Sequence, residues 1–307
     1  DPLILAVSGR EPWRAQADVV VHDEGIELRN VHLASGPQRL ELSGTYSYSQ
    51  AYGVDATLQA FDVGGLRELL GIDLADLDGT VDGELHLTGV PGQPRIDAQG
   101  SLRHGVFLGM TDLTVLLSLV FVENRFDVET EVQLPDGSRV ALYAGGEPGR
   151  GATWGTQIEN GNYQFGLDFE QLPFEVTRPW LSWLGLEPPG GKVSAMVRGA
   201  GTLEAPTLEL TSRVEKLAIG TYAPIDLDVA LKHDSQVLEL ERLQIDDAEG
   251  ELVTLSGTIE AELGELFNVN GLRASLDTRP FDLRMRVPPR RHDALPAPLT
   301  LEDYPFY

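Results

Sequence analysis

Apolar and polar residues alternate along most of the chain. Runs of this kind include Ala15, Ala17, Val19 and Val21; Leu40, Leu42 and Tyr46; Val54, Ala56 and Leu58; Phe126, Val128 and Val132; Phe165, Leu167 and Phe169; and Ile225, Leu227, Val229 and Leu231. A period of two is typical of β-strands with one apolar and one polar face. Turn sequences separate the runs, among them residues 135–137, 160–161 and 246–250. Because such short connections cannot make parallel crossovers, the pattern predicts a mainly β, mostly antiparallel fold.

Two segments depart from the alternation and predict short helices near residues 62–71 and 177–185. Each has large apolar residues at helical spacing: Leu66, Leu69 and Leu70 in the first, and Trp180, Leu181, Trp183 and Leu184 in the second. Asp62 and Thr177 are suitable N-caps, and a glycine closes each segment, at Gly71 and Gly185. Helices this short are not stable alone, so we expect both to brace the sheet.

The chain also repeats a long phrase. Residues 79–100 match residues 191–212 in spacing, alternation and turn residues after a shift of 112 positions, and residues 26–46 resemble 238–259. A phenylalanine followed by an acidic residue also recurs, at Phe61-Asp62, Phe174-Glu175 and Phe281-Asp282. Such a period predicts a repeat architecture. The expected units are a partial first unit (1–60), a second (61–173), a third (174–280) and the start of a further unit or tail (281–307).

These phrases resemble the TamB family, the inner-membrane component of the bacterial translocation and assembly module, and the broader AsmA-like proteins. The resemblance rests on a short helix ending in Leu-Leu-Gly, then G-x-V with alternation, a glycine, a proline and another alternating strand. It is carried by residues 69–105 and 184–214 and by the two Leu-Ser-Gly-Thr stretches beginning at Leu42 and Leu255. Because the family's amino-terminal membrane anchor is not recognised here, we expect an internal fragment of a longer protein.

The resemblance implies a long, curved sheet folded into an open hydrophobic groove, a repeating β-groove also called a β-taco. It implies a periplasmic protein of a Gram-negative bacterium, anchored in the inner membrane in its full-length form. Proteins of this type resemble bridge-like lipid transfer proteins and carry phospholipid between inner and outer membranes, which supports outer-membrane biogenesis. The TamB branch is also linked to outer-membrane protein assembly through a TamA-like barrel partner, which would bind parts outside this fragment.

The inward-facing positions of the expected strands would line such a groove. The lining residues predicted in this way are Val19, Val21, Leu40, Leu42, Val81, Leu85, Leu87, Ile96, Val115, Leu117, Leu119, Phe121, Phe126, Val128, Val132, Phe165, Leu167, Phe169, Val193, Val197, Leu208, Leu210, Leu227, Val229, Leu231, Leu255 and Ile259. Filling the groove with acyl chains would contribute about 0.8 kcal/mol per buried methylene.

Alternation alone leaves other functions open. A structural or adhesive β-repeat, with apolar faces packed on each other, has the same period, and so does a scaffold for outer-membrane protein assembly. Residues 114–126 are apolar on both faces, which predicts a strand buried on two sides. It is either a core strand beneath a short helix, or a strand with one face in the groove and the other against a helix. An open sheet would also leave unpaired edges, which favour end-to-end association of the fragment.

The composition of the chain narrows the classes of partner that it could bind. The chain of 307 residues has 48 acidic and 23 basic residues, a formal charge of −25, which argues against a nucleic-acid partner. The segment from Arg273 to Arg291 contains six arginines, and its only acidic residues are Asp277 and Asp282. This segment is either a solvated strand face or a contact for anionic head groups or an acidic partner. No apolar run approaches the roughly 20 residues of a membrane-spanning helix.

No motif indicates catalysis, a metal or a cofactor. The chain has no cysteine, and its six histidines are scattered without the spacing of a zinc site. The acidic turn at 246–249 lacks the ligand spacing of an EF-hand, and residues 145–151 lack the Lys-Ser/Thr of a phosphate loop. With no nucleophile elbow either, the sequence predicts a non-enzymatic protein without catalytic residues.

Overall fold

The computed structural model describes residues 3–5, 12–49, 51–64, 77–90, 93–107, 110–149, 160–177, 190–202, 205–218, 224–234, 236–260 and 279–289. The chain divides into two compact units, residues 1–150 and 151–307. This division does not coincide with the repeat boundaries at residues 60, 173 and 280, which stay a prediction.

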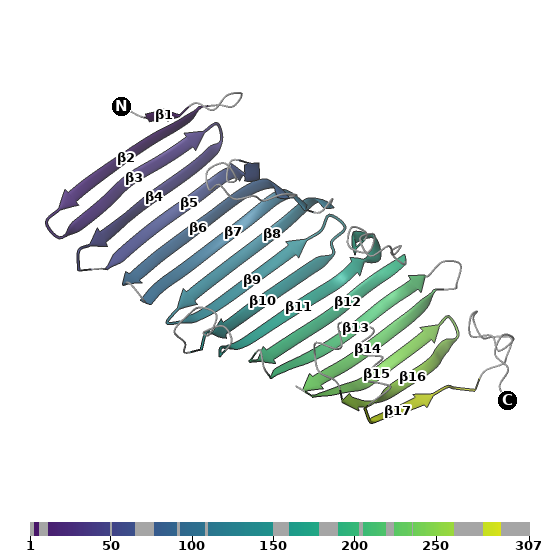
Figure 1. Cartoon of the computed structure of the whole chain (residues 1–307). Coiled ribbons are helices and arrows are strands. Elements are labelled where there is room, and N and C mark those ends of the chain that lie inside the picture. Colours follow the sequence, from purple (N-terminus) through teal and green to yellow (C-terminus); the bar gives the residue numbers. More distant parts are fainter. Residues whose placement is uncertain are drawn as a thin grey trace. The chain divides into compact units, whose positions relative to one another are not determined.

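Unit 1 is an open antiparallel sheet in which each strand pairs with the next along the chain (Figure 1). Tight turns connect several neighbours; Glu123 and Asn124, for example, join two strands with φ angles of 50° and 72°. Its strands are β1 (Leu3–Leu5), β2 (Trp13–His22), β3 (Gly25–Ser35), β4 (Gln38–Ser47), β5 (Tyr52–Asp62), β6 (Leu77–Val90), β7 (Gln93–Phe107), β8 (Met110–Val122), β9 (Arg125–Gln133) and β10 (Arg139–Glu147).

Unit 2 follows the same plan, with every consecutive pair of strands antiparallel. Its elements are β11 (Asn162–Pro173), the 3₁₀ helix η1 (Phe174–Thr177), β12 (Gly190–Gly201), β13 (Pro206–Ala218), β14 (Ile225–Asp234), β15 (Val237–Asp247), β16 (Gly250–Glu260) and β17 (Phe281–Arg286). The predicted class, a mainly β and open antiparallel sheet, is confirmed.

The predicted helices fall largely outside the described residues. β5 runs through Asp62, so the N-cap proposed there is still a strand residue, and only Val63 and Gly64 are seen in helical conformation. Near the second predicted helix, Thr177 is the last residue of the 3₁₀ helix η1, and residues 178–189 lie outside the described residues. The bracing residues Leu66, Leu69, Leu70, Trp180, Leu181, Trp183 and Leu184 all lie outside the described residues.

Matching β-bulges occur in the two units. In unit 1, Gln59 and Ala60 of β5 lie opposite the single residue Asp82, and Ala60 has a φ of 51°. In unit 2, Glu170 and Gln171 of β11 lie opposite Ser194, and Gln171 has a φ of 53°. In both bulges two residues on one strand oppose one on its partner.

Each bulge is held by a side chain from the neighbouring strand. The Ala60 N–H donates to Asp82 Oδ1 at 2.9 Å, and the Gln171 N–H donates to Ser194 Oγ at 3.1 Å. Glycines with positive φ recur in the same way, at Gly79 (133°) and Gly191 (118°). The shift of 112 positions seen in the sequence therefore corresponds to a recurring backbone irregularity in each sheet.

Candidate functional site

One face of the unit 1 sheet is apolar from β2 to β10. Directly opposite residues of an antiparallel pair point to the same side of the sheet. Val19 on β2 lies opposite Leu28 on β3, and Leu42 on β4 lies opposite Ala56 on β5. A longer row crosses four strands, through Leu87, Ile96, Phe121 and Phe126. We call this side the apolar face of unit 1; every predicted lining residue between Val19 and Val132 lies on it.

Unit 2 has an apolar face built in the same way. One row runs Leu167, Val197, Leu210, Leu231 and Leu240, each directly opposite the next. Every predicted lining residue between Phe165 and Ile259 lies on this face. The structure therefore brings the predicted residues of each unit together on one side of that unit's sheet. Whether they line a lipid groove stays a prediction.

The bulges keep the apolar residues on one face. Wherever a bulge adds a residue, the apolar spacing changes from two to three, as between Leu58 and Phe61 and between Phe169 and Leu172. A strict alternation through these points would move the rest of the strand's apolar residues to the opposite side. The bulges were not predicted from the sequence, although this step in apolar spacing from two to three was the available signal.

Sequence reasoning also missed several members of these faces. On β3, Ile26, Leu28, Val31 and Leu33 all lie opposite apolar residues of β4 or a glycine. In unit 2, Leu238 and Leu243 of β15 lie opposite Ile259 and Leu255. His233 was unexpected, because it lies between Leu208 and Leu238 on the apolar face and is 2% exposed. These residues were missed because apolar and polar residues alternate least regularly in the bulged strands.

The apolar face of unit 1 is unevenly covered. Val19 and Val21 are 56% and 68% exposed, whereas Phe61 on β5, near the opposite ends of the strands, is fully buried. Trp13 of β2 stacks on Phe61 of β5, with ring centroids 5.4 Å apart. In a flat sheet these strands would lie about 14 Å apart, so the two rings lean together above the intervening β3 and β4. Part of the apolar face is therefore packed and part of it is open.

The prediction of two-sided burial for residues 114–126 is wrong. Leu116 and Leu117 point to opposite faces of β8, and they are 45% and 46% exposed. Leu116 lies between Ser101 and Glu131 on the polar face. Leu113, on the apolar face near the bulges, is 2% exposed and is the buried residue of this strand. β8 is therefore buried at Leu113, near one end, and accessible from both faces at Leu116 and Leu117 in its middle.

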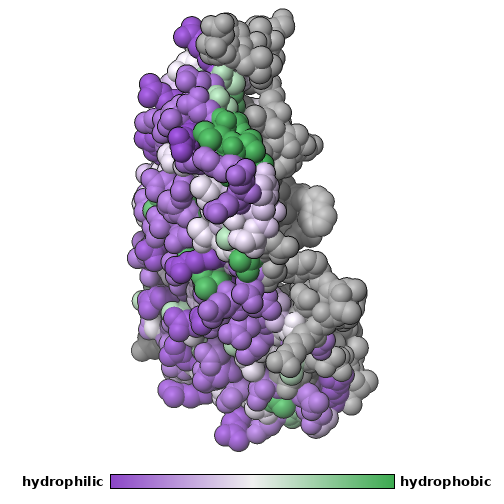
Figure 2. All heavy atoms as spheres, turned by 90° about the vertical axis from the view of Figure 1, so that its left-hand side faces the viewer, coloured by the Kyte–Doolittle hydropathy of each residue, from purple (hydrophilic) through white to green (hydrophobic). Residues whose placement is uncertain are grey.

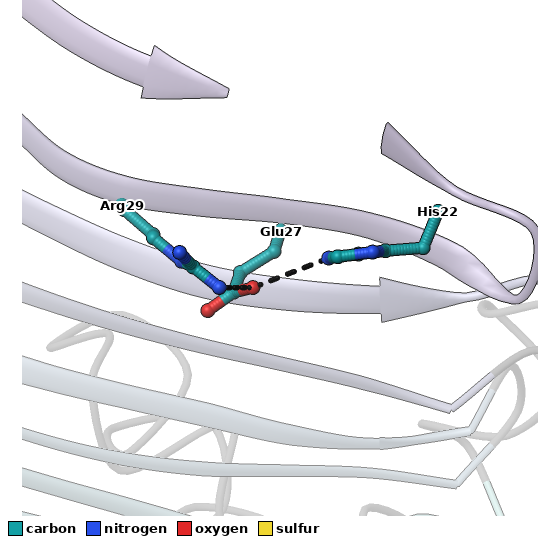
Figure 3. A network of polar contacts seen from close by, with 3 residues as sticks. All are labelled: His22, Glu27 and Arg29. Atoms are coloured by element: carbon teal, nitrogen blue, oxygen red, sulfur yellow. Dashed lines mark hydrogen bonds and ion pairs between the residues drawn. The ribbon is translucent and has the colours of Figure 1, made fainter. Parts of the chain in front are cut away.

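The opposite face of each sheet is polar and charged. In unit 1, Arg29 donates to Glu27 at 2.5 Å while His22 Nε2 lies 3.5 Å from the same carboxylate (Figure 3). The hydrogen bond from Arg29 lowers the pKa of Glu27. His86 Nδ1 lies 2.6 Å from Asp55 Oδ1, and this contact raises the pKa of His86. In unit 2, Glu241 lies 2.7 Å from Lys232 and raises the pKa of that amine.

These exposed pairs form cross-strand or same-strand contacts typical of a solvated sheet face. The side of the molecule shown in Figure 2 is mostly hydrophilic, with hydrophobic residues in separate patches, in keeping with the charge of −25. Among the described residues, no group of three or more histidine, aspartate or glutamate side chains could hold a metal ion. The described helical residues include no segment long and apolar enough to cross a membrane.

Comparisons with protein-family models, with curated proteins and with solved structures found no match for this chain. The candidate site therefore rests on the geometry of the two apolar faces.

Proposed function

We propose that the apolar faces hold the acyl chains of phospholipids, as the resemblance to TamB and AsmA-like proteins suggests. The chain would then be a non-enzymatic periplasmic segment that carries phospholipid between inner and outer membranes in support of outer-membrane biogenesis. The observation that carries the proposal is the register of apolar residues across consecutive strands, combined with their incomplete burial: Val19, Val21, Leu117 and Phe165 are 43–68% exposed, and most of the other lining residues are half-buried. A protein whose apolar faces only packed on each other would bury these residues.

The chemistry of the faces suits acyl chains. Rows such as Leu167, Val197 and Leu210 offer aliphatic surface without charged groups. An acyl chain laid on such a row removes apolar area from water at both surfaces, with about 25 cal/mol gained per Å² buried. The charged opposite face keeps the segment soluble while the apolar face is occupied.

A structural or adhesive β-repeat, or a scaffold for outer-membrane protein assembly, would use the same faces differently. A repeat would cover them with its own side chains, and a scaffold would bind strands through them. Neither has a separate observation in its favour, so both are outcomes of the test below.

The test is native mass spectrometry of the purified chain, with organic extraction of bound molecules. We expect co-purified phospholipid, and we expect Leu117→Asp to reduce it about tenfold, since desolvating a carboxylate beside an acyl chain costs more than about 1.4 kcal/mol. The matched control is Leu116→Asp. It places the same charge on the same strand at nearly equal exposure, 45% against 46%, but on the polar face.

Three results would count against the proposal. They are a folded chain without phospholipid, equal loss of lipid in both variants, and co-purified unfolded outer-membrane protein in place of lipid. Circular dichroism of each variant separates loss of lipid from loss of fold. Leu113→Asp, at a residue only 2% exposed, provides the signature of an unfolded variant.

A further inference from the structure

β17 differs from the other strands of unit 2 because all six of its residues are exposed. It pairs with β16, and Phe281, Leu283 and Met285 lie opposite Ile259, Gly257 and Leu255, so they continue the apolar face. Together with Val287, these side chains are between 43% and 69% exposed. Within unit 2, β17 is the last strand in the order of pairing (Figure 1).

The same strand carries positive charge in an acidic chain. Residues 279–291 contain five arginines and one acidic residue, Asp282, while the whole chain has a formal charge of −25. Arg284 and Arg286 lie on the polar face, opposite Ser256 and Thr254, and their side chains are 80% and 76% exposed. Apolar and cationic side chains therefore alternate along β17.

The carboxylates near these arginines hold them only weakly. Arg284 lies 3.1 Å from Asp282, and Arg286 lies 3.8 Å from Glu251. Ion pairs between exposed side chains contribute little to stability, because water and salt screen them and the long side chains lose entropy. Both guanidinium groups can exchange these partners for another anion without disturbing the sheet.

We propose that β17 docks edge-on onto an anionic phospholipid surface. Phe281, Leu283 and Met285 would enter the boundary between head groups and acyl chains, while Arg284 and Arg286 reach around the strand to the phosphates. Long arginine side chains keep the guanidinium in the polar layer while their stems pass along apolar groups. A membrane interface offers both environments within the width of one strand.

The negative charge of the rest of the chain restricts this docking to one place. Electrostatic interactions extend only about 8–10 Å at physiological salt, so the arginines of β17 act locally. The acidic remainder is repelled from an anionic bilayer, which favours contact through β17 alone. The proposal does not depend on lipid carriage by the apolar faces, because it needs no bound acyl chain.

Flotation with vesicles tests the docking. The 307-residue chain is mixed with vesicles of phosphatidylcholine alone, or of phosphatidylcholine with about one third phosphatidylglycerol, a fraction that gives a clear negative surface potential. We expect binding to the anionic vesicles only. The double substitution Arg284→Gln with Arg286→Gln should weaken it about tenfold or more. Met285→Gln should weaken it several-fold.

Each variant has a matched control within unit 2. Arg198→Gln with Arg213→Gln removes the same charge from exposed positions on the polar faces of β12 and β13. Met196→Gln changes a methionine that is 39% exposed on the polar face of β12. Binding of both controls should stay within about twofold of wild type, since neither lies on the docking strand.

Several outcomes would overturn the proposal. Equal binding to neutral vesicles, equal loss in the Arg198/Arg213 control, or no vesicle binding would each do so. Self-association that is lost in the Arg284/Arg286 variant, without vesicle binding, would instead identify a second copy of the chain as the occupant. Absence of co-purified lipid would sink the proposed function and leave this result unaffected.

Discussion

At the scale of single residues, side chains that support the bulges have clear structural roles. Asp82 accepts the N–H of Ala60 and also pairs with Arg103, and the first of these contacts is the main cause of its lowered pKa. Ser194 has the corresponding position in unit 2, but its hydroxyl carries no charge. Hydrogen bonds to ionised acceptors are stronger than those between neutral groups.

We therefore expect Asp82→Ala to destabilise the chain by about 1–2 kcal/mol, and Ser194→Ala by about 0.5–1 kcal/mol. Because the pKa of Asp82 is lower when folded, its carboxylate stabilises the fold above its unfolded pKa, near 3.8. That contribution is lost as the pH falls through the folded pKa. Urea unfolding at pH 7 and at about pH 3 measures the difference.

The effect of Asp82→Ala should shrink in acid, whereas the effect of Ser194→Ala should not change with pH. An equal effect of the two substitutions at neutral pH would contradict the charge-assisted role of Asp82.

At the scale of the elements, glycines with positive φ allow neighbouring strands to pair irregularly while their apolar residues stay on one face. A Cβ on Gly191 would lie 2.6 Å from the carbonyl oxygen of Glu215, and one on Gly79 would lie 3.0 Å from that of Arg103. Gly53 is different, because its nearest neighbours would be 3.8 Å away and its φ is ordinary. Comparison of the three glycines therefore separates the combined effect of positive φ and close backbone contact from the general effect of adding a methyl group.

Gly79→Ala and Gly191→Ala should each destabilise the fold by about 1–3 kcal/mol, because alanine is strained at these φ values. Gly53→Ala should change stability by no more than about 0.5 kcal/mol. The shift in urea midpoint measures each effect. Equal shifts for all three would show that the backbone at Gly79 and Gly191 is not specially constrained.

At the scale of the whole molecule, exposed apolar residues and a large negative charge coexist. Soluble monomers rarely expose more than a few hundred Å² of contiguous apolar surface without a functional reason. In unit 1 alone, Val19, Val21 and Leu117 are each at least 46% exposed on the apolar face. The charge of −25 opposes association of like chains through such surfaces.

We expect the chain, after removal of any bound lipid, to bind an apolar fluorescent dye while its circular dichroism remains that of a folded β-protein. Short-chain phosphatidylcholine should displace the dye, because both would occupy the same apolar faces. Dye fluorescence that appears only on unfolding would show that the native faces are covered, and would favour a structural repeat.

The sequence by itself determined the class of fold and the composition of the faces. Period-two alternation in runs such as Val19 to Val21 or Leu227 to Leu231 requires that apolar side chains point one way in an extended strand. The short turns required antiparallel pairing. The shift of 112 positions aligned Gly79 with Gly191, and both are glycines with positive φ in the structure. These features are local, so no knowledge of distant contacts was needed.

Only the tertiary structure decided how the strands pair and what they leave exposed. The bulges at Ala60 and Gln171 depend on a neighbouring strand that supplies Asp82 or Ser194, and alternation within one strand cannot reveal that partner. Exposure depends on layers: Leu116 and Leu117 look like core residues in an apolar run, but a single layer of strands leaves both accessible. Hydropathy reports which side chains avoid water, whereas burial requires another surface to cover them.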